Sequence, residues 1–479
     1  MPESSADIDV LARLRTEFAA SDGVAASVSV EAADLDRVRE DRSGRRAPDR
    51  PIAVVYATSI DDVQRLLRLA TATHTPVVPR GAGTGLAGGA TGGPGAIVLD
   101  LSRMNRILEL DPIDELAVVE AGVLNGDLNA AAAAHGLWYA PDPASRAISS
   151  VGGNIATNAG GLLCAKYGVT REAVLGLAVV LADGRLVRTG RRTVKGVTGY
   201  DLTALLTGSE GTLGIIVEAT VRLRPRPEGE PVTIAAAFAD VEAAAAGCAA
   251  VTAARLRPAM LELVDDLGLG RVVDHLGAAA IAGTPVEHLA PGEALVIAQA
   301  DDTDAAVRAA RIAEVLRAAG GRVEVSTDTV AAERLIGLRR AWHPALAATG
   351  EVLIEDIAVP RSKLPDMFRV IGEIGRRHGI EIPTLAHAGD GNLHPNFVFT
   401  GDEPPAEVWA AADELFRAAV ALGGTLTGEH GVGILKRRWL RDELGDDGYD
   451  LQRGLKALFD PAGVLNPGVM FDVSNEPRR

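Results

Sequence analysis

The chain has 479 residues, 47% of them hydrophobic, and a formal net charge of −16 at pH 7. This length exceeds one ordinary hydrophobic core, so two or three domains are expected. The negative charge argues against nucleic-acid binding, which needs a basic surface to neutralise phosphates. Cys164 and Cys248 are the only cysteines, which excludes a disulfide framework and favours a reducing cytoplasm. No apolar run is long enough to span a membrane. Peripheral attachment to the inner face of the membrane, through a partner protein, is the remaining possibility for membrane contact.

Apolar periodicity divides the chain into four parts. Residues 1–45 predict a charged, helical lead-in. In residues 46–228, short strand patterns alternate with helix patterns, and a hairpin is expected around Asp183-Gly184. Residues 229–423 predict an α+β domain with helices on one face of its sheet. Residues 424–479 form the C-terminal segment.

A glycine-rich loop, PRGAGTGLAGGA, lies between two predicted buried strands. Gly83, Gly85 and Gly88 match the GxGxxG pattern, but a Rossmann site needs a helix directly after the loop, and here another strand follows. Consecutive backbone N–H groups can still bind a phosphate as an anion nest, and Arg80 and Thr84 would add a charge and a hydroxyl. A flexible surface loop is the alternative, although such loops are rarely so dense in glycine.

Two further segments share this composition. PDPASRAISSVGGNIATNAGGL, residues 141–162, is rich in small side chains, hydroxyls and amides, and GSEGTLGI follows at residues 208–215. Glycine lets backbone approach a ligand closely. Three such loops in one domain therefore predict an extended cofactor that touches backbone at several points.

These loops resemble the FAD-binding domain of the vanillyl-alcohol-oxidase and p-cresol-methylhydroxylase (PCMH) superfamily. HAGDGNLHPNF, GEHGVG and LNPG resemble the branch that contains the FAD-binding subunit of glycolate oxidase, FAD-linked D-lactate dehydrogenase and D-2-hydroxyglutarate dehydrogenase. The resemblance covers residues 46–471 and implies an α+β fold. Its parts would be a two-subdomain PCMH-type FAD-binding domain, an α+β substrate (cap) domain with an antiparallel sheet, and a C-terminal helical tail that returns to the flavin. The first loop has no histidine, so the implied FAD is non-covalent.

The resemblance also implies FAD-dependent oxidation of a D-2-hydroxy acid to the 2-oxo acid, with hydride transfer to flavin N5. The residues implied to contact FAD lie in the three glycine-rich segments and in LNPG. They are Arg80, Gly81, Ala82, Gly83, Thr84, Gly85, Pro141, Ser145, Ser149, Gly152, Gly153, Thr157, Asn158, Glu210, Gly211, Gly214, Ile216 and Asn466.

Two histidines flank the dipeptide Asp390-Gly391 in TLAHAGDGNLHPNFVF. Asp-Gly favours a two-residue type I′ turn, and counting outward from it pairs His387 directly with His394 on one face. Directly opposed Cβ atoms lie roughly 4.5–5.5 Å apart, which lets two imidazoles converge on a divalent metal, with zinc as the expected ion. Glu429 is the candidate third ligand, and the resemblance implies the same set. An unmetallated histidine pair that binds the substrate carboxylate is the alternative.

The resemblance implies that His430 is the catalytic base. A histidine with a near-neutral pKa suits removal of the hydroxyl proton, and a metal on the same hydroxyl would assist it. Arg339 stands where the family has an arginine that binds the substrate carboxylate, although Arg339 or its neighbour Arg340 could also be an ordinary solvated helix charge. Asn392, at the edge of the turn, either holds the substrate or caps the turn.

Two departures from the D-2-hydroxyglutarate enzymes bear on the substrate. His343 and Ile354 stand where those enzymes carry a threonine and a lysine that help hold the distal carboxylate. His343 then becomes a candidate substrate contact, and lactate, glycolate or a larger monocarboxylate is favoured, with D-2-hydroxyglutarate as the alternative. A non-redox alkyl transferase, a non-catalytic FAD subunit and a flavin-free metallohydrolase explain the motifs less well. The electron acceptor (oxygen, a quinone, a cytochrome or a flavoprotein) and a homodimeric state stay open.

Overall fold

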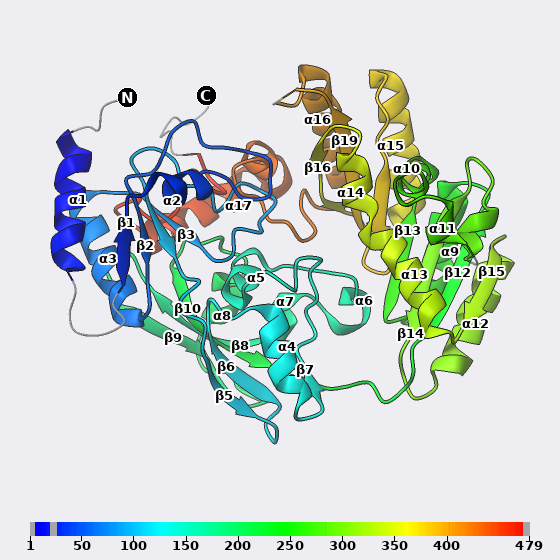
Figure 1. Ribbon diagram of the computed structural model, residues 1–479, viewed down its shortest axis with the longest axis horizontal. Coiled ribbons are helices and arrows are strands. Elements are labelled where there is room, and N and C mark those ends of the chain that lie inside the picture. The colour runs from blue at the N-terminus through cyan, green and yellow to red at the C-terminus, as the bar shows by residue number, and fades with distance from the viewer. Residues whose placement is uncertain (1–4, 20–25, 283, 402, 473–479) are drawn as a thin grey trace. The chain divides into compact units, whose positions relative to one another are not determined.

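The computed structural model describes residues 5–19, 26–282, 284–401 and 403–472, which form two compact units (Figure 1). Unit 1 comprises Met1–Ala159, Val169–Pro225 and Glu429–Arg479, and unit 2 comprises Gly160–Gly168 and Arg226–Gly428. The nine residues from Gly160 to Gly168, which the sequence places in the FAD-binding domain, therefore belong to unit 2. We describe each unit by itself.

The first sheet of unit 1 has four strands in the order β1-β2-β4-β3. Strands β2, β4 and β3 are parallel, and β1 is antiparallel to β2. Its elements are α1 (Ser5–Glu17), β1 (Ser27–Ser29), α2 (Ala32–Arg37), β2 (Ala53–Tyr56), α3 (Ile60–Thr73), β3 (Val77–Arg80) and β4 (Ile97–Asp100). Ser59 caps α3 as expected, since its side chain accepts a hydrogen bond from the backbone N–H of Asp62. The first glycine-rich loop joins β3 directly to strand β4, which confirms that no Rossmann helix follows it.

The second sheet of unit 1 is antiparallel, in the order β5-β6-β10-β8-β9. The hairpin expected around Asp183-Gly184 is confirmed, because Val180 pairs with Leu186 and Gly184 has φ +82°. The two sheets are the two subdomains that the resemblance implies. The strands and helices of this part are β5 (Ile107–Asp111), β6 (Leu116–Glu120), α4 (Asn125–Ala133), β7 (Leu137–Trp138), α5 (Val151–Thr157), α7 (Thr170–Ala173), β8 (Val174–Val180), β9 (Leu186–Gly190), α8 (Leu202–Leu206), β10 (Ile215–Arg222) and β11 (Arg224–Pro225).

Helix α5 lies inside the second glycine-rich segment. The sequence predicts a loop there, and for Val151–Thr157 that prediction is wrong. Two glycines lower the helix propensity of this stretch, so its pattern does not indicate a helix. The Ser150 side chain accepts a 3.2 Å hydrogen bond from the backbone N–H of Gly153, and Ile155 is fully buried in the core of unit 1. The N-cap and tertiary packing thus stabilise a helix that propensity disfavours.

The sheet of unit 2 has the order β15-β12-β14-β13-β18-β19-β16, with β17 paired to β19. All of these pairings are antiparallel, which confirms the prediction for the second domain. The strands are β12 (Val232–Phe238), β13 (Met260–Val264), β14 (Ala294–Ala300), β15 (Arg322–Ser326), β16 (Glu351–Ile354), β17 (Ile357–Ala358), β18 (Thr384–His387) and β19 (Asn392–Phe399).

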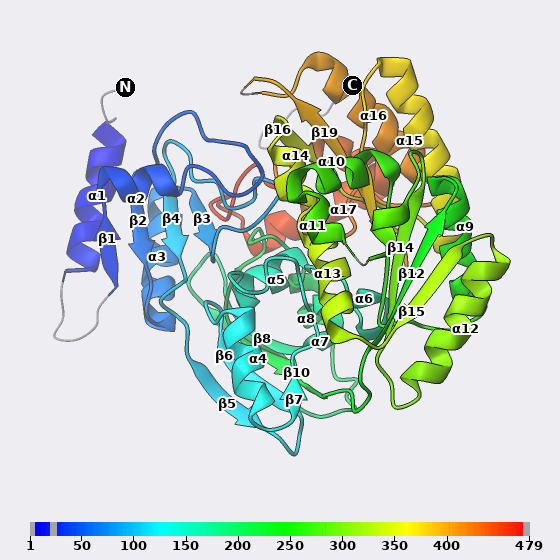
Figure 2. The ribbon, with the colours of Figure 1, turned by 45° about the vertical axis from the view of Figure 1, so that its right-hand side comes forward.

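Helices cover both faces of this sheet, so the expectation of one covered face is wrong. Figure 2 shows α12 and α13 on opposite sides of the strands. Ile297 packs on one face with Leu338 of α13 and Trp342 of α14. On the other face, a Cβ at Gly247 of α9 would lie 2.7 Å from the Phe238 ring. Strands buried on both faces show continuous apolar runs rather than alternation, as VTIAAAF and ALVIAQA do.

The helices of unit 2 come from its two chain segments, Gly160–Gly168 and Arg226–Gly428. They are α6 (Cys164–Tyr167), α9 (Val241–Ala253), α10 (Asp266–Leu276), α11 (Ala278–Ile281), α12 (Ala305–Ala318), α13 (Thr329–Arg340), α14 (Trp342–Ala347), α15 (Leu364–His378) and α16 (Ala406–Ala421).

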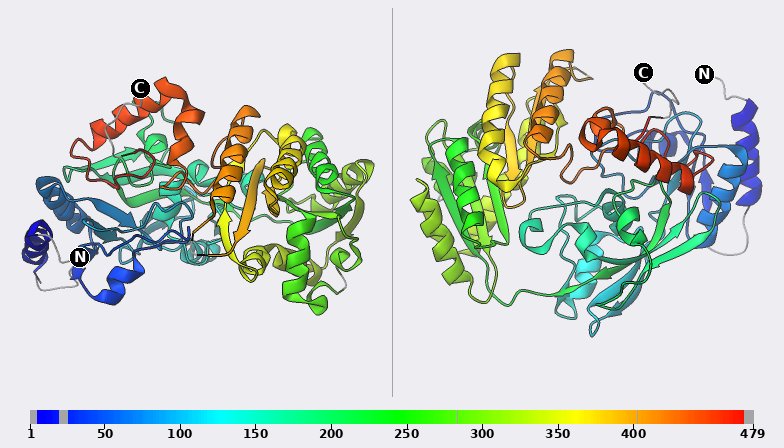
Figure 3. Two further views of the ribbon diagram at one scale, coloured as in Figure 1. Left: turned by 90° about the horizontal axis from the view of Figure 1, so that it is seen from above. Right: turned by 180° about the vertical axis from the view of Figure 1, so that it is seen from behind.

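The C-terminal segment folds back onto unit 1. Both views in Figure 3 show its helix α17 (Leu440–Phe459) against the N-terminal part of the same unit. Lys456 Nζ donates hydrogen bonds to the carbonyl oxygens of Thr212 and Leu465, at 2.8 and 2.7 Å, and Leu465 bridges to Val77 of β3. The helical tail that the resemblance implies is therefore present. Among the described residues, no helix is both long and apolar enough to cross a membrane.

Candidate functional site

The three glycine-rich segments converge within unit 1. A Cβ at Gly81, in the first segment, would lie 2.3 Å from Ser150 Oγ in the second. A Cβ at Gly211, in the third, would lie 2.4 Å from Pro79 Cγ, and this glycine has φ +72°. Only glycine permits contacts this close. The segments thus form one continuous backbone surface, as expected for loops that share a cofactor.

Buried polar atoms at this surface fit FAD. Ser149 Oγ, Asn154 Nδ2 and Ser209 Oγ are buried and have no hydrogen-bond partner within the described part of the protein. Buried polar groups almost always have a partner, and the phosphate and ribityl oxygens of FAD are suitable acceptors for these donors. The second and third segments therefore supply both close backbone and polar groups for the cofactor.

Arg80 and Asn466 hold the loops in shape. Arg80 is buried, and its Nη1 donates to the backbone carbonyl oxygens of Glu40 and Ala90, at 2.9 and 2.8 Å. Asn466 Nδ2 donates to carbonyl oxygens in the first and third glycine-rich segments, at 2.9 and 2.8 Å. Both side chains therefore have structural partners, and direct contact of either with FAD stays a prediction.

The other residues expected to contact FAD belong to the same surface. They divide by segment into Gly81, Ala82, Gly83, Thr84 and Gly85 after β3; Pro141, Ser145 and Ser149 before α5, with Gly152, Gly153 and Thr157 in α5 and Asn158 at its end; and Glu210, Gly211 and Gly214 after α8, with Ile216 in β10. Asn158 has φ +52° and its side-chain oxygen accepts the backbone N–H of Arg171, so it terminates α5. Their contacts with FAD likewise stay predictions.

Replacing Gly81 with alanine is expected to lower FAD binding. The new methyl group would start 2.3 Å from Ser150 Oγ, so either Ser150 must rotate and lose its hydrogen bond with Gly153, or the first segment must move away from α5. Overpacking of this kind costs about 1–3 kcal/mol and would open the backbone surface. The ratio of flavin to protein after purification measures the effect. Gly93→Ala is the matched control, because its Cβ would make only an ordinary 3.7 Å contact with Ala47; equal flavin loss in both variants would contradict the prediction.

The hairpin that carries His387 and His394 has a different turn from the one predicted. His387 pairs with Asn392 and Leu385 pairs with His394, so the loop has four residues, 388–391, and the expected two-residue turn is wrong. A type I′ turn requires positive φ at both central residues, and only Gly391 has it, at +85°. The two histidines are therefore not directly opposed.

Backbone hydrogen bonds to strand β13 and to the residue after β17 explain the wider loop. The backbone N–H of Gly389 donates to the carbonyl oxygen of Leu261 in β13, at 3.2 Å. The carbonyl oxygen of Gly391 accepts the N–H of Val359, at 2.9 Å. Such long-range bonds outweigh the local preference of Asp-Gly, because buried backbone groups must be paired.

The histidines still share one face, since the pairing differs from the predicted one by two residues and side chains alternate with period two. They are diagonal neighbours with ring centroids 5.1 Å apart and ring planes at 85°. Each offers a nitrogen, and the two lie within 4.8 Å of each other. Both are buried, and this separation would let the pair reach one metal ion, but metal binding by the pair stays a prediction.

Glu262 supports His387 from the neighbouring strand. It is opposite His387 in the β13–β18 pairing, and its Oε1 lies 2.7 Å from His387 Nδ1. Arg339 Nε donates to the other carboxylate oxygen, at 2.8 Å. Burial opposes ionisation of Glu262, but His387 and Arg339 outweigh it, so its pKa is lowered. A histidine whose Nδ1 lies beside a carboxylate can offer Nε2 to a metal ion, which is the usual arrangement at metal sites.

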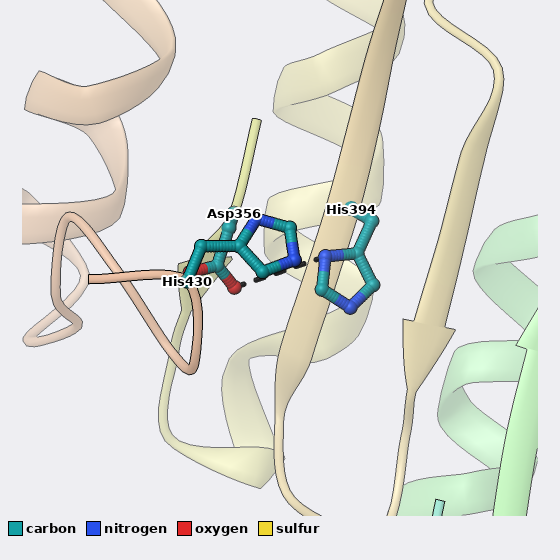
Figure 4. Close-up of side chains that lie close together, drawn as sticks. All are labelled: Asp356, His394 and His430. Carbon is teal, nitrogen blue, oxygen red and sulfur yellow. Dashed lines mark ion pairs between the residues drawn. The ribbon is translucent and has the colours of Figure 1, made fainter. Parts of the chain in front are cut away.

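Asp356 lies close to His394, at a distance longer than a hydrogen bond. Figure 4 shows the Asp356 side chain next to His394 of β19, with Asp356 Oδ1 3.7 Å from His394 Nδ1. The figure also draws His430, which follows Gly428 by two residues. Asp356 also accepts hydrogen bonds from Asn392 Nδ2, at 2.7 Å, and Thr427 Oγ1, at 2.6 Å.

The remaining amide hydrogen of Asn392 goes to the carbonyl oxygen of Ile357, at 2.8 Å. Both donors of the Asn392 amide thus have structural partners, and only its side-chain oxygen is left for a substrate role.

Glu429 and His430 follow directly after the last residue of unit 2 in the chain. Gly428 belongs to unit 2, and a Cβ there would lie 2.2 Å from Asn392 Nδ2 and 3.1 Å from Asp356 Oδ1. Consecutive Cα atoms are about 3.8 Å apart across a trans peptide, and Glu429 is the next residue of the chain after Gly428. Its Oε1 lies 3.8 Å from His430 Nε2. That Glu429 and His430 act together with the hairpin histidines stays a prediction.

The structure separates the other substrate candidates. Arg340 is exposed and pairs with Glu333 at 3.3 Å, so it is the solvated helix charge, whereas Arg339 points to the buried Glu262. His343 is exposed on α14, unlike the buried hairpin histidines. Its role as a substrate contact stays a prediction.

Glu262 and Asp356 were missed in the sequence, although each left a signal. Glu262 is a charged residue inside the apolar strand MLELV, and Asp356 belongs to an acidic pair between two strand patterns. Both are fully buried, at 0% exposure. Buried charges of this kind are retained when paired with a partner or a metal ion.

Comparisons with known proteins agree with this geometry. Two family models match: the FAD binding domain over residues 51–190, and the C-terminal domain of FAD linked oxidases over residues 229–470. Glycolate oxidase subunit GlcD of Bacillus subtilis (strain 168) is 41% identical over 427 residues, 88% of this chain and 89% of the relative. D-lactate dehydrogenase of Archaeoglobus fulgidus is 38% identical over 417 residues, 87% and 90% of the two chains.

The fold has a counterpart among solved structures. The crystal structure of p-cresol methylhydroxylase with substrate bound superposes with a TM-score of 0.78 over 99% of each chain, at 18% identity. That likeness concerns the fold alone, while the family model and the relatives above cover most of the sequence. The chain therefore belongs to the FAD-linked oxidase family and is an FAD-linked oxidoreductase with a PCMH-type fold.

Proposed function

We propose that this protein oxidises a D-2-hydroxy acid to the corresponding 2-oxo acid. The observation that carries the proposal is the buried pair His387 and His394, with a buried carboxylate 2.7 Å from the first and another 3.7 Å from the second. Glu429 and His430 are the next two residues of the chain after Gly428. Relatives named glycolate oxidase subunit and D-lactate dehydrogenase support the same substrate class. The proposal covers the substrate and the roles of these side chains.

In this proposal His387, His394 and Glu429 hold a divalent metal ion, with zinc as the expected ion. Two imidazoles and one carboxylate leave coordination positions open, as in catalytic zinc sites. The hydrogen bond between His387 Nδ1 and Glu262 orients the ring and makes Nε2 the ligand atom. A metal held there would polarise the hydroxyl and the carboxylate of the substrate.

His430 takes the hydroxyl proton of the substrate. The carboxylate of Glu429, 3.8 Å from His430 Nε2, stabilises the positive charge that the imidazole gains. FAD, when bound, supplies the acceptor for the α-hydrogen and its electron pair. Arg339 binds the substrate carboxylate through its terminal nitrogens, because its Nε already donates to Glu262.

The favoured substrates are lactate, glycolate or a larger monocarboxylate. His343 and Ile354 replace the threonine and lysine that hold a second carboxylate in the hydroxyglutarate enzymes, which makes D-2-hydroxyglutarate the alternative. Without the threonine and the lysine, a second carboxylate would lose two of its polar partners, which would weaken binding of D-2-hydroxyglutarate.

Anaerobic flavin bleaching tests the function. Purified protein is mixed without oxygen with glycolate, D-lactate, L-lactate or D-2-hydroxyglutarate, and loss of flavin absorbance is followed. Glycolate or D-lactate is expected to bleach the flavin fastest, and reoxidation by oxygen, a quinone analogue or cytochrome c then identifies the electron acceptor. Absence of bleaching by every 2-hydroxy acid, or preference for the L-isomer, would contradict the proposal.

A further inference from the structure

One buried carboxylate holds the turn that carries His430. Glu210, in the third glycine-rich segment, accepts the backbone N–H of Val432 on Oε1 and that of Gly433 on Oε2, both at 2.8 Å. These are the second and third peptide groups after His430. All four residues belong to unit 1. A bond to each carboxylate oxygen fixes both the position and the orientation of this backbone.

Both the backbone conformation and the burial of Glu210 are energetically unfavourable. Its φ is +50°, in the left-handed region that glycine and asparagine favour and that strains a residue with a side chain. Burial raises the pKa of Glu210 to about 7, against the lowering effect of the N–H groups of Val432 and Gly433. A strained, buried carboxylate persists where the surrounding structure over-determines it, and such residues cluster at functional sites.

The backbone of Glu210 is itself fastened. Its N–H donates to the carbonyl oxygen of Ala156 in α5, at 2.8 Å, and its carbonyl oxygen accepts Asn466 Nδ2, at 2.8 Å. The side chain therefore projects from a rigid point between the second glycine-rich segment and LNPG. A displacement of the Glu210 backbone would therefore also displace the turn at residues 431–433, which the Glu210 side chain binds.

Two glycines of the turn after His430 allow the close approach of the Glu210 carboxylate and of the first glycine-rich segment. Gly431, next to His430, has φ +87°, and a Cβ there would lie 3.0 Å from Glu210 Oε1. A Cβ at Gly433 would lie 1.9 Å from the carbonyl oxygen of Ala87, which also accepts the N–H of Ile434 at 2.9 Å. The first and third glycine-rich segments thus both form hydrogen bonds with the residues directly after His430.

We propose that Glu210 is a positioning residue for His430 and not a ligand of FAD. Both of its carboxylate oxygens already accept backbone N–H groups, and a carboxylate beside the pyrophosphate would be repelled by it. Glu210 acts through the turn: it holds the residues after His430 against the cofactor-binding segments. This inference rests on the proposed role of His430 as the base.

Hydrogen exchange in the FAD-bound protein tests the contact without relying on the reaction. Glu210→Gln keeps the shape of the side chain but places an NH₂ group opposite one backbone N–H, so one hydrogen bond is lost. Amide exchange in the peptide spanning residues 428–436 is expected to become about tenfold faster. Glu120→Gln is the matched control, since Glu120 is also buried and accepts the backbone N–H of Arg106, at 2.8 Å, elsewhere in unit 1.

Activity and cofactor content complete the test. In Glu210→Gln, FAD content is expected to equal that of the wild type, while anaerobic bleaching slows about 10²-fold, the effect of misplacing a reacting group by about 1 Å. Gly431→Ala displaces the same contact from the other side and should give both effects. Unchanged exchange, wild-type bleaching, or loss of FAD without faster exchange would each overturn the inference. Because exchange is independent of turnover, normal bleaching in His430→Ala would instead overturn the proposed function.

Discussion

Replacing His430 with alanine is expected to slow anaerobic flavin bleaching by about 10²–10⁴-fold, the usual contribution of a positioned general base. FAD should stay bound, because the three glycine-rich segments converge through contacts such as Gly81 with Ser150 that do not involve His430. The measurement is stopped-flow absorbance of the flavin after mixing with D-lactate or glycolate, with flavin content determined on the same sample.

His135→Ala is the control for this variant. His135 is an exposed histidine of unit 1 at the end of α4, so its replacement should leave both flavin content and bleaching unchanged. If His430→Ala bleaches at the wild-type rate, the base is another group. If the His430→Ala variant loses FAD, His430 is needed to hold the cofactor, and slow bleaching would then not identify it as the base.

Removing the metal, or replacing His394 with alanine, is expected to abolish bleaching. Chelator treatment followed by Zn²⁺ should restore the wild-type protein but not His394→Ala, because the variant lacks one of the two buried imidazoles. Glu262→Gln should weaken metal binding by about 10–100-fold, since it removes the carboxylate that orients His387. The ratio of metal to protein, measured by elemental analysis alongside bleaching, reports both effects.

His378→Gln controls for the loss of a histidine in unit 2. His378 ends α15 and its Nε2 lies 2.8 Å from Glu414 Oε1, so its replacement should not change the metal content. Full bleaching activity in metal-free protein would remove the metal from the proposal. The histidine pair would then be an unmetallated site for the substrate carboxylate, the alternative that the sequence left open.

Local patterns predicted the elements well where a short stretch contains its own signal. Ser59 caps α3, and the chain turns at Gly184 between β8 and β9, because a cap or a left-handed turn depends on a few neighbouring residues. Prediction failed where distant partners decide the conformation. Asp390-Gly391 favours a two-residue turn, but bonds to Leu261 and Val359 widen the loop to four residues.

The side chains that support the site could not be located from the sequence. Glu262 meets His387 because β13 pairs with β18, although the two residues are 125 positions apart. Glu210 meets the turn after His430 across more than 200 positions. Spacing along the chain carries no information on such pairs, because tertiary packing alone sets which strands and loops become neighbours.

The sequence by itself determined the family, the expectation of a shared cofactor in three glycine-rich segments, and the placement of the two histidines on one face of a hairpin. These rest on motifs and on the period-two alternation of a strand, which survives a pairing shift of two residues. Only the tertiary structure decided which groups support those residues: Glu262 and Asp356 behind the histidines, and Glu210 beneath the His430 turn. The physical reason is that buried carboxylates and backbone groups must find partners, and the fold determines which partners lie within reach.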